Sequence, residues 1–167
     1  MGIESGQVTM RPALDADAGQ IRAWLRRPEI ARWWGSLAAA EAEIMIATET
    51  ATSIRRLVMV DGRAVGYGQA VDAGLTGEED LLSLPPGTWD ISLFIAEPEL
   101  RGKGYGLAAL RLLADEVFST TLALGLSVVV SVRNEAAVRI YERAGFRWQR
   151  VLTDPLFGPS WLMLRPR

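Results

Sequence analysis

Polar and apolar side chains alternate over residues 89–96, where Asp90, Ser92 and Phe94 fall on one face and aliphatic side chains fall on the other. This period of two predicts a β-strand with two distinct faces. The valine-rich residues 126–132 predict a strand in the middle of a sheet. Further strands are predicted at residues 8–11, 56–60, 63–70, 147–152 and 160–164.

The dipeptide Asp61-Gly62 separates two of these strands. Its glycine tolerates the positive φ of a tight turn, so a hairpin is predicted here. Residues 71–87 are rich in glycine and proline and contain the acidic cluster Glu78, Glu79 and Asp80. They predict a loop over the sheet, with room for one turn of helix.

Helical spacing of apolar side chains appears between the strands. The first helix carries Ile21, Trp24 and Leu25, with Asp15 or Asp17 as its cap. Three more predicted segments are a short turn over residues 28–34, a stretch over 39–50 capped by Ser36, and a helix that carries Leu107, Leu110, Ala114 and Val117. Asn134 caps the last helix, which closes at Gly145. The predicted order is β-α-α-β-β-β-α-β-α-β-β, a mixed α/β sheet in one domain over residues 1–167.

Composition removes several kinds of chemistry. The chain has no cysteine and no histidine, which excludes a disulfide framework, thiolate zinc sites and His-assisted nucleophiles. Its 18 basic and 20 acidic residues give a net charge of −2, so neither nucleic acid nor an anionic membrane is an expected partner. Residues 1–7 are polar and do not resemble a signal peptide, and no apolar run reaches the length of a membrane span. A cytoplasmic location is expected.

A glycine-rich turn links the alternating strand to the following helix. The first N–H groups of a helix lack partners within it, and glycines allow an anion to approach this backbone closely. The segment predicts a pyrophosphate site, and it consists of Arg101, Gly102, Lys103, Gly104, Tyr105 and Gly106. It is not a P-loop, and it is not the dinucleotide fingerprint, whose third glycine would fall on Leu107. A turn with solvated charges is the structural alternative.

A second motif over residues 134–146 contains Asn134, Tyr141 and Gly145. Together with Arg101-x-x-Gly104-x-Gly106, it resembles the signature of the GNAT acyltransferase superfamily. The resemblance implies that the first motif binds the pyrophosphate of acetyl-CoA and that the second lines the thioester end. No metal is implied. The cofactor-binding positions that follow from it are Phe94, Ile95, residues 101–106, Asn134 and Tyr141.

The same resemblance implies direct attack of an amine on the thioester, with no acyl-enzyme. Tyr141 matches the tyrosine that protonates the departing thiolate, and Asn134 matches the residue that holds the pantetheine arm. The alternatives are a packed core aromatic for Tyr141 and simple helix capping for Asn134. Asp90, shortly before the pyrophosphate turn, is a candidate base or an anchor for an ammonium group. A polar residue on a wet sheet face is the other reading of Asp90.

Residues 24–35 narrow the resemblance to aminoglycoside 6′-N-acetyltransferases and their siderophore hydroxylysine-acetylating relatives. In the aminoglycoside branch, an acidic loop precedes the strand and an aspartate at the position of Asp90 is the base. Glu78, Glu79 and Asp80 fit that loop, and Trp33 and Trp34 offer flat walls for a sugar ring or an ammonium group. Taken singly, they also fit a solvated face and helix packing.

Val129 departs from this branch, which carries a substrate-gripping aspartate at that position. The leading hypothesis is therefore acetyl-CoA-dependent acetylation of a primary amine on a cationic small molecule, with an aminoglycoside as one candidate. Acetylation of a protein N-terminus or lysine, and a non-catalytic acyl-CoA-binding module, stay open. A nucleotide-dependent oxidoreductase is disfavoured by the incomplete fingerprint. Monomer and homodimer are both compatible with the sequence.

Overall fold

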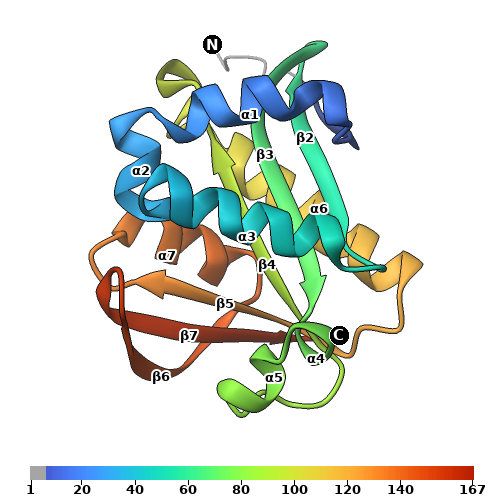
Figure 1. Ribbon diagram of the computed structural model, residues 1–167, viewed down its shortest axis with the longest axis vertical. Coiled ribbons are helices and arrows are strands. Elements are labelled where there is room, and N and C mark those ends of the chain that lie inside the picture. Colours follow the sequence, from blue (N-terminus) through green and yellow to red (C-terminus); the bar gives the residue numbers. More distant parts are fainter. Residues whose placement is uncertain (1–6) are drawn as a thin grey trace.

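The computed structural model describes residues 7–167, whose seven strands form one mixed sheet in the order β1-β2-β3-β4-β5-β7-β6 (Figure 1). The strands are β1 (Val8–Pro12), β2 (Ile54–Val60), β3 (Arg63–Asp72), β4 (Thr88–Ile95), β5 (Gly125–Ser131), β6 (Arg147–Asp154) and β7 (Gly158–Pro166). Only the β4–β5 pair is parallel, and the other pairs are antiparallel. The predicted mixed α/β fold is confirmed. The prediction about a signal peptide concerns residues that lie mainly outside the described ones.

Helices cover both faces of the sheet (Figure 1). They are α1 (Ala18–Leu25), α2 (Pro28–Trp34), α3 (Leu37–Glu49), α4 (Ala73–Thr76), α5 (Glu78–Leu81), α6 (Tyr105–Thr120) and α7 (Glu135–Arg143), with short 3₁₀ turns at Asp15–Asp17 and Pro98–Leu100. Helix α6 packs against β1, β3 and β4, whereas α3 packs against β2 and β3 on the opposite face. The central strands of the sheet are therefore buried between two helical layers, whereas the edge strand β6 is mostly exposed.

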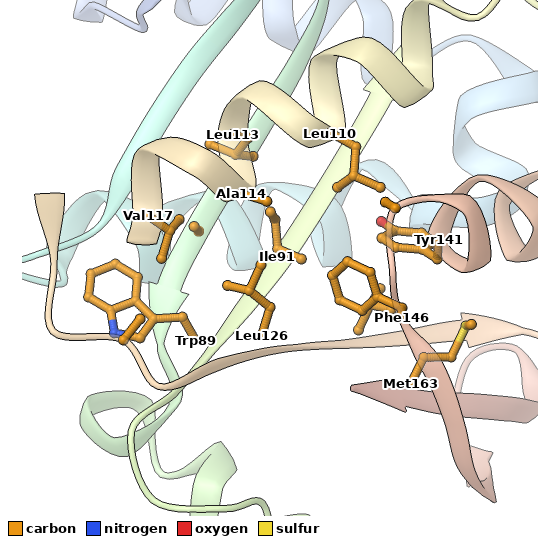
Figure 2. Close-up of a cluster of buried hydrophobic side chains, with 14 of the residues drawn as sticks. Trp89, Ile91, Leu110, Leu113, Ala114, Val117, Leu126, Tyr141, Phe146 and Met163 are labelled. Carbon is orange, nitrogen blue, oxygen red and sulfur yellow. The ribbon is translucent and has the colours of Figure 1, made fainter. Parts of the chain in front are cut away.

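The largest buried cluster lies between α6, α7 and the middle of the sheet. Figure 2 shows Trp89 and Ile91 of β4 on the same side as Leu113 and Val117 of α6, with Tyr141 at one end of the cluster. Phe94 belongs instead to a second cluster beneath α1 and α2. The two faces of β4 therefore have different surroundings, as the alternating pattern predicts.

Strands β4 and β5 diverge after a short parallel ladder. Residue pairing covers only Thr88 with Gly125, Trp89 with Leu126 and Asp90 with Ser127, although both strands continue further. Figure 1 shows β5 turned away from β4 beyond this point. Beyond Asp90 and Ser127, the two strands therefore no longer pair with each other.

Local sequence signals account for several of the boundaries. Ser36 and Asn134 accept hydrogen bonds from the backbone N–H groups of Ala39 and Ala137, and so cap α3 and α7 as predicted. Asp61 and Gly62 both adopt positive φ, at 50° and 79°, which confirms the tight hairpin turn.

Other predictions about the elements are corrected by the structure. Three helices, not two, separate β1 from β2, because Pro28–Trp34 forms a complete helix of its own. Strand β3 extends to Asp72, and the predicted loop after it contains α4 and α5. Asp17 does not cap α1 with its side chain, because its carboxylate pairs with Arg11 and accepts from the backbone of Leu14.

Candidate active site

An acidic cavity of about 480 Å³ lies beside the point where β4 and β5 diverge. Four carboxylate side chains from four different elements line it, namely Glu43, Glu78, Asp90 and Asp154. Among the described residues that line this cavity, none is basic. The cavity therefore favours a cation, because carboxylates left without counter-charges concentrate positive ligands.

A second cavity of about 610 Å³ follows the glycine-rich turn and the start of α6. Gly102 and Gly104 have φ values of 72° and 88°, a region that side-chain-bearing residues rarely adopt. Gly104 is the N-cap of α6, so the helix N-terminus opens onto this groove. N–H groups and the helix dipole together make such a terminus an anion site, which suits a pyrophosphate.

Arg101 has a structural role in this turn. Its guanidinium donates to the backbone carbonyls of Ile95 and Ala96, at 3.1 and 3.3 Å. Ala96 also accepts from Arg27 at the start of α2, at 2.9 Å. The two arginines thus fix the end of β4 against the turn, while Arg101 still lines the groove.

The acidic cavity and the groove meet at one place. Six residues line both, namely Trp33, Trp34, Leu93, Asn134, Ala137 and Tyr141. An acyl carrier held in the groove and a cation held in the acidic cavity would therefore come together at this junction. This geometry suits a direct transfer between two bound substrates, since proximity alone supplies a large part of such a rate enhancement.

Tyr141 lies at the junction on α7, and its ring packs edge-on against Phe146 with centroids 5.2 Å apart. The side chain is buried. Burial, and to a smaller extent the charge of Asp90, raises the pKa of Tyr141 above its ordinary value. The phenol is therefore protonated near neutral pH, as a proton donor must be. Tyr141 is thus both a core aromatic and a cavity residue.

Asp90 has no ion-pair partner among the described residues, and it lines the acidic cavity from β4. Burial raises its pKa well above the ordinary value, and the charges of Glu78 and Glu43 raise it further. A carboxylate with a raised pKa is a better base near neutral pH than an ordinary one. Asp90 is thus a half-buried carboxylate that faces a cavity, and its role as a base stays a prediction.

Two neighbouring carboxylates share this electrostatic environment. Burial raises the pKa of Glu78, and burial together with the charges of Glu78 and Asp154 raises that of Glu43. Glu43 lines the cavity, and its side chain is exposed. Mutual repulsion within the group would be relieved by a bound cation.

The two tryptophans of α2 have different neighbours. Trp34 packs edge-on against Phe94 and Tyr67, with ring centroids 5.1 and 6.4 Å apart. Trp33 carries the Arg32 guanidinium over its ring, 4.6 Å from the centroid. Each of the two tryptophans lines both cavities. Trp34 therefore packs against neighbouring rings and also forms part of the cavity wall.

Most of the predicted cofactor positions lie along the groove. Those that line it are Phe94, Ile95, Arg101, Gly102, Gly104, Gly106, Asn134 and Tyr141. Lys103 and Tyr105 do not line either cavity. Lys103 is exposed, and the Tyr105 ring is buried in a cluster with Val65 and Ala109, because it points back into the core from the first helical position.

Of the three acidic residues in the predicted loop, only Glu78 lines the acidic cavity, which is called the acceptor cavity from here on. Glu79 accepts a hydrogen bond from the backbone N–H of Gly87, at 3.3 Å, and Asp80 is exposed. The loop folds into the helix α5, which gives its three acidic residues different directions. Val129 lines the cavity as an apolar patch within it.

Glu43 and Asp154 are cavity residues that the sequence did not suggest. Glu43 belongs to α3 and Asp154 to the end of β6, both far from the recognised motifs in sequence. The carboxylate of Asp154 also accepts from the backbone of Leu156 and Phe157, so it orders the β6–β7 turn at the cavity. Neither residue belongs to a local sequence motif, so the sequence alone could not identify them.

No group of three or more metal-ligating side chains is placed to hold a metal ion within residues 7–167. None of the helices in this part of the chain combines the length and the apolar character that a bilayer crossing demands.

Comparison with known proteins agrees with this geometry. Residues 13–153 match the family model described as an acetyltransferase (GNAT) domain. Aminoglycoside N(6′)-acetyltransferase type 1 of Klebsiella pneumoniae is 30% identical over 173 residues, which cover 96% of this chain and 83% of the relative. The kanamycin resistance protein of Rhizobium radiobacter is 33% identical over 82 residues, 49% of this chain and 75% of that protein.

Solved structures extend the comparison to the fold. Aminoglycoside acetyltransferase AAC(6′)-Ib in complex with coenzyme A and kanamycin superposes with a TM-score of 0.81 and 29% identity, over 96% of this chain and 95% of that one. The fold and the groove thus define the protein as a coenzyme A-dependent acyltransferase. The chain belongs to the GNAT acetyltransferase family, and it is an acetyl-CoA-dependent N-acetyltransferase.

Proposed function

We propose that the acceptor is a small molecule carrying several amines, with the 6′-amine of an aminoglycoside as the leading candidate. The observation that carries this proposal is the acidic cavity, with its four carboxylates and no basic lining residue, next to the groove. Its volume lies within the range of small-molecule sites. The aminoglycoside acetyltransferases among the relatives support the same acceptor class.

The groove fits acetyl-CoA by its own features. Gly102 and Gly104 hold the turn in a conformation that leaves backbone N–H groups available at the start of α6, where the pyrophosphate would lie. Leu93, Phe94 and Ile95 at the end of β4 line the groove, so an extended arm would run beside this strand to reach the junction. Asn134 uses its side-chain oxygen to cap α7, so its amide N–H₂ is the part that can face this arm.

The proposed reaction assigns its proton transfers to two residues. Asp90 takes a proton from the acceptor ammonium, which leaves a neutral amine to attack the thioester carbonyl. A new C–N bond forms and the C–S bond breaks. Tyr141 donates its proton to the departing sulfur and recovers one from the nitrogen, so the net products are an amide, free CoA and one proton released to solvent.

A protein acceptor is the second candidate, and the position of α5 argues against it. Glu78, Leu81 and Leu82 line the acceptor cavity, so the segment around α5 covers the cavity instead of folding away from it. A peptide substrate needs an open groove at this place. A non-catalytic acyl-CoA-binding module would need neither the Asp90 carboxylate nor the Tyr141 phenol in this cavity.

The location, oligomeric state and partners of the protein are also proposed. We expect the enzyme to act in the cytoplasm, where its acetyl donor is made and used, as a monomer or homodimer of one domain. Nucleic acid and membranes are not proposed as partners.

The test is CoA release from acetyl-CoA with a panel of kanamycin, spermidine, hydroxylysine and a lysine-containing peptide. We expect kanamycin to give the highest kcat/KM. Preference for the peptide would replace the proposed acceptor with a protein. Tight binding of acetyl-CoA with no turnover of any amine would support a binding module.

A further inference from the structure

Ser92 on β4 carries a buried hydroxyl with no hydrogen-bond partner among the described residues. Such groups are rare, because an unpaired buried hydroxyl has lost its hydration without gaining a hydrogen bond. The residue itself lines the acceptor cavity and keeps some accessible surface. Ser92 shares with Asp90 one face of the alternating strand.

The position of Ser92 along β4 is informative. Leu93, which is adjacent to Ser92, lines both cavities and marks their junction. Asp90 is three residues from Leu93, roughly 10 Å along an extended strand, and it lines only the acceptor cavity. Along β4, Ser92 therefore lies between Asp90 and Leu93, one of the six residues at the junction.

This separation matters for the proton transfer. An amine that attacks a thioester must lie at the junction, whereas a base accepts a proton directly only at hydrogen-bonding distance or through one intervening group. Asp90 and Ser92 point to the same face, with Cα atoms about 7 Å apart along the strand. A hydroxyl both donates and accepts, so it can fill this gap.

The surroundings leave the hydroxyl available for this role. Across the β3–β4 ladder, Ser92 faces Gln69, whose side-chain oxygen already accepts from the Tyr67 hydroxyl at 2.8 Å. The Ser92 side chain can change between staggered rotamers by one rotation about its Cα–Cβ bond. Such a rotation can turn Oγ toward the cavity that the residue lines.

We propose that Ser92 is a further catalytic residue, whose hydroxyl relays the proton of the acceptor ammonium to Asp90. This inference rests on the proposed function of the cavity. The ammonium N–H bond breaks as Ser92 Oγ takes that proton, and the Ser92 O–H bond breaks as Asp90 takes the hydroxyl proton. Ser92 ends neutral, the amine ends neutral and Asp90 ends as a carboxylic acid.

The charged and titratable groups around Asp90 are consistent with this direction of transfer. They are Glu43 on α3, Glu78 on α5, Tyr141 on α7 and Asp154 at the end of β6. The charges of two of them, Glu78 and Glu43, favour a proton on Asp90. A proton that leaves the acceptor therefore moves toward the region of highest negative charge.

The test compares Ser92→Ala and Ser92→Thr with the wild type, with kanamycin and acetyl-CoA as substrates, over pH 6 to 9. A relay predicts that S92A lowers kcat about 100-fold at pH 7, since general acid–base groups contribute about 10²–10⁴-fold. The loss should shrink as pH rises, because more amine then arrives already deprotonated. KM for acetyl-CoA should change less than about twofold, and S92T should keep kcat within about fivefold because it retains the hydroxyl.

Ser127→Ala is the matched control. Ser127 is the other buried hydroxyl without a partner among residues 7–167, and it lies opposite Asp90 in the parallel ladder. It lines neither cavity, so S127A should leave kcat unchanged. Full activity of S92A, a loss that is the same at every pH, or an S92T loss as large as that of S92A would each overturn the relay.

The proposed function fails in a different way. If wild-type enzyme binds acetyl-CoA but acetylates none of the amines in the panel, the acceptor assignment is wrong and the relay falls with it. If wild-type enzyme turns over kanamycin and S92A does so equally, only the relay is wrong.

Discussion

The carboxylate of Asp90 on β4 and the phenol of Tyr141 on α7 act on each other across the acceptor cavity. The negative charge of Asp90 adds to burial in raising the pKa of Tyr141. When Asp90 takes a proton, that charge disappears and the pKa of Tyr141 falls. The first proton step therefore makes Tyr141 a better acid for the second one, the protonation of the departing thiolate.

Replacing Asp90 by asparagine should lower kcat by about 10²–10⁴-fold, the usual contribution of a general base. The amide keeps the shape of the side chain and cannot accept the proton. Steady-state kinetics at pH 7 check this. Asp80→Asn is the control, because Asp80 is exposed and lies outside both cavities, and it should keep full activity. Full turnover in D90N would remove Asp90 from the mechanism.

The same D90N change should stabilise the folded protein at neutral pH. The pKa of Asp90 is higher in the folded than in the unfolded state, so the free energy of unfolding falls as pH rises from about 4 through the folded pKa. D90N removes this loss, which amounts to about 1.4 kcal/mol for each unit by which the pKa is raised. Urea unfolding at pH 3 and pH 7 should show a gain at pH 7 and little change at pH 3. An equal effect at both values would contradict the assignment.

Tyr141→Phe should reduce kcat by about 10²-fold or more while the fold is kept. Phenylalanine preserves the edge-on contact with Phe146, so the melting temperature should change by only a few degrees. Rapid-mixing kinetics should show slow CoA release with unchanged binding of acetyl-CoA. A Y141F enzyme that releases CoA at the normal rate would mean that another group protonates the thiolate.

Much of the site could be read from the sequence because its motifs are local. The glycine-rich turn, the caps at Ser36 and Asn134 and the alternation around Asp90 depend on residues close together in the chain. Glu43 and Asp154 could not be found this way, because only the packing of α3 and β6 around the cavity brings them to Asp90. The directions of the Tyr105 and Glu79 side chains could not be predicted for a related reason, since the exact direction of a side chain depends on helix phase.

Glu43→Gln should raise KM for kanamycin about 5- to 10-fold and leave KM for acetyl-CoA unchanged. Glu43 faces the acceptor cavity, where its charge attracts the substrate cation. The effect should weaken in high salt, because ions screen the attraction. The control is Glu49→Gln on the same helix, where the side chain is exposed and outside both cavities. Equal KM shifts in E43Q and E49Q would show that general charge, not the cavity, is responsible.

Gly104→Ala should weaken acetyl-CoA binding. Its φ of 88° is strained for alanine by roughly 1 kcal/mol, and the resulting shift moves the N–H groups at the start of α6. Gly62→Ala introduces similar strain at φ 79° in the β2–β3 turn, and Gly62 lines neither cavity. Both variants should lose similar stability, but calorimetry should show weaker acetyl-CoA binding only for G104A. Unchanged binding in G104A would argue against a pyrophosphate site at this turn.

The central claim, that the acidic cavity presents a polycationic amine to acetyl-CoA, is tested most directly by the product formed from kanamycin. Wild-type enzyme should release one CoA per kanamycin, and NMR of the product should show a single acetyl group on the 6′-amine. D90N should form this product at least about 100 times more slowly. No CoA release from kanamycin, together with rapid acetylation of a peptide amine, would contradict the account.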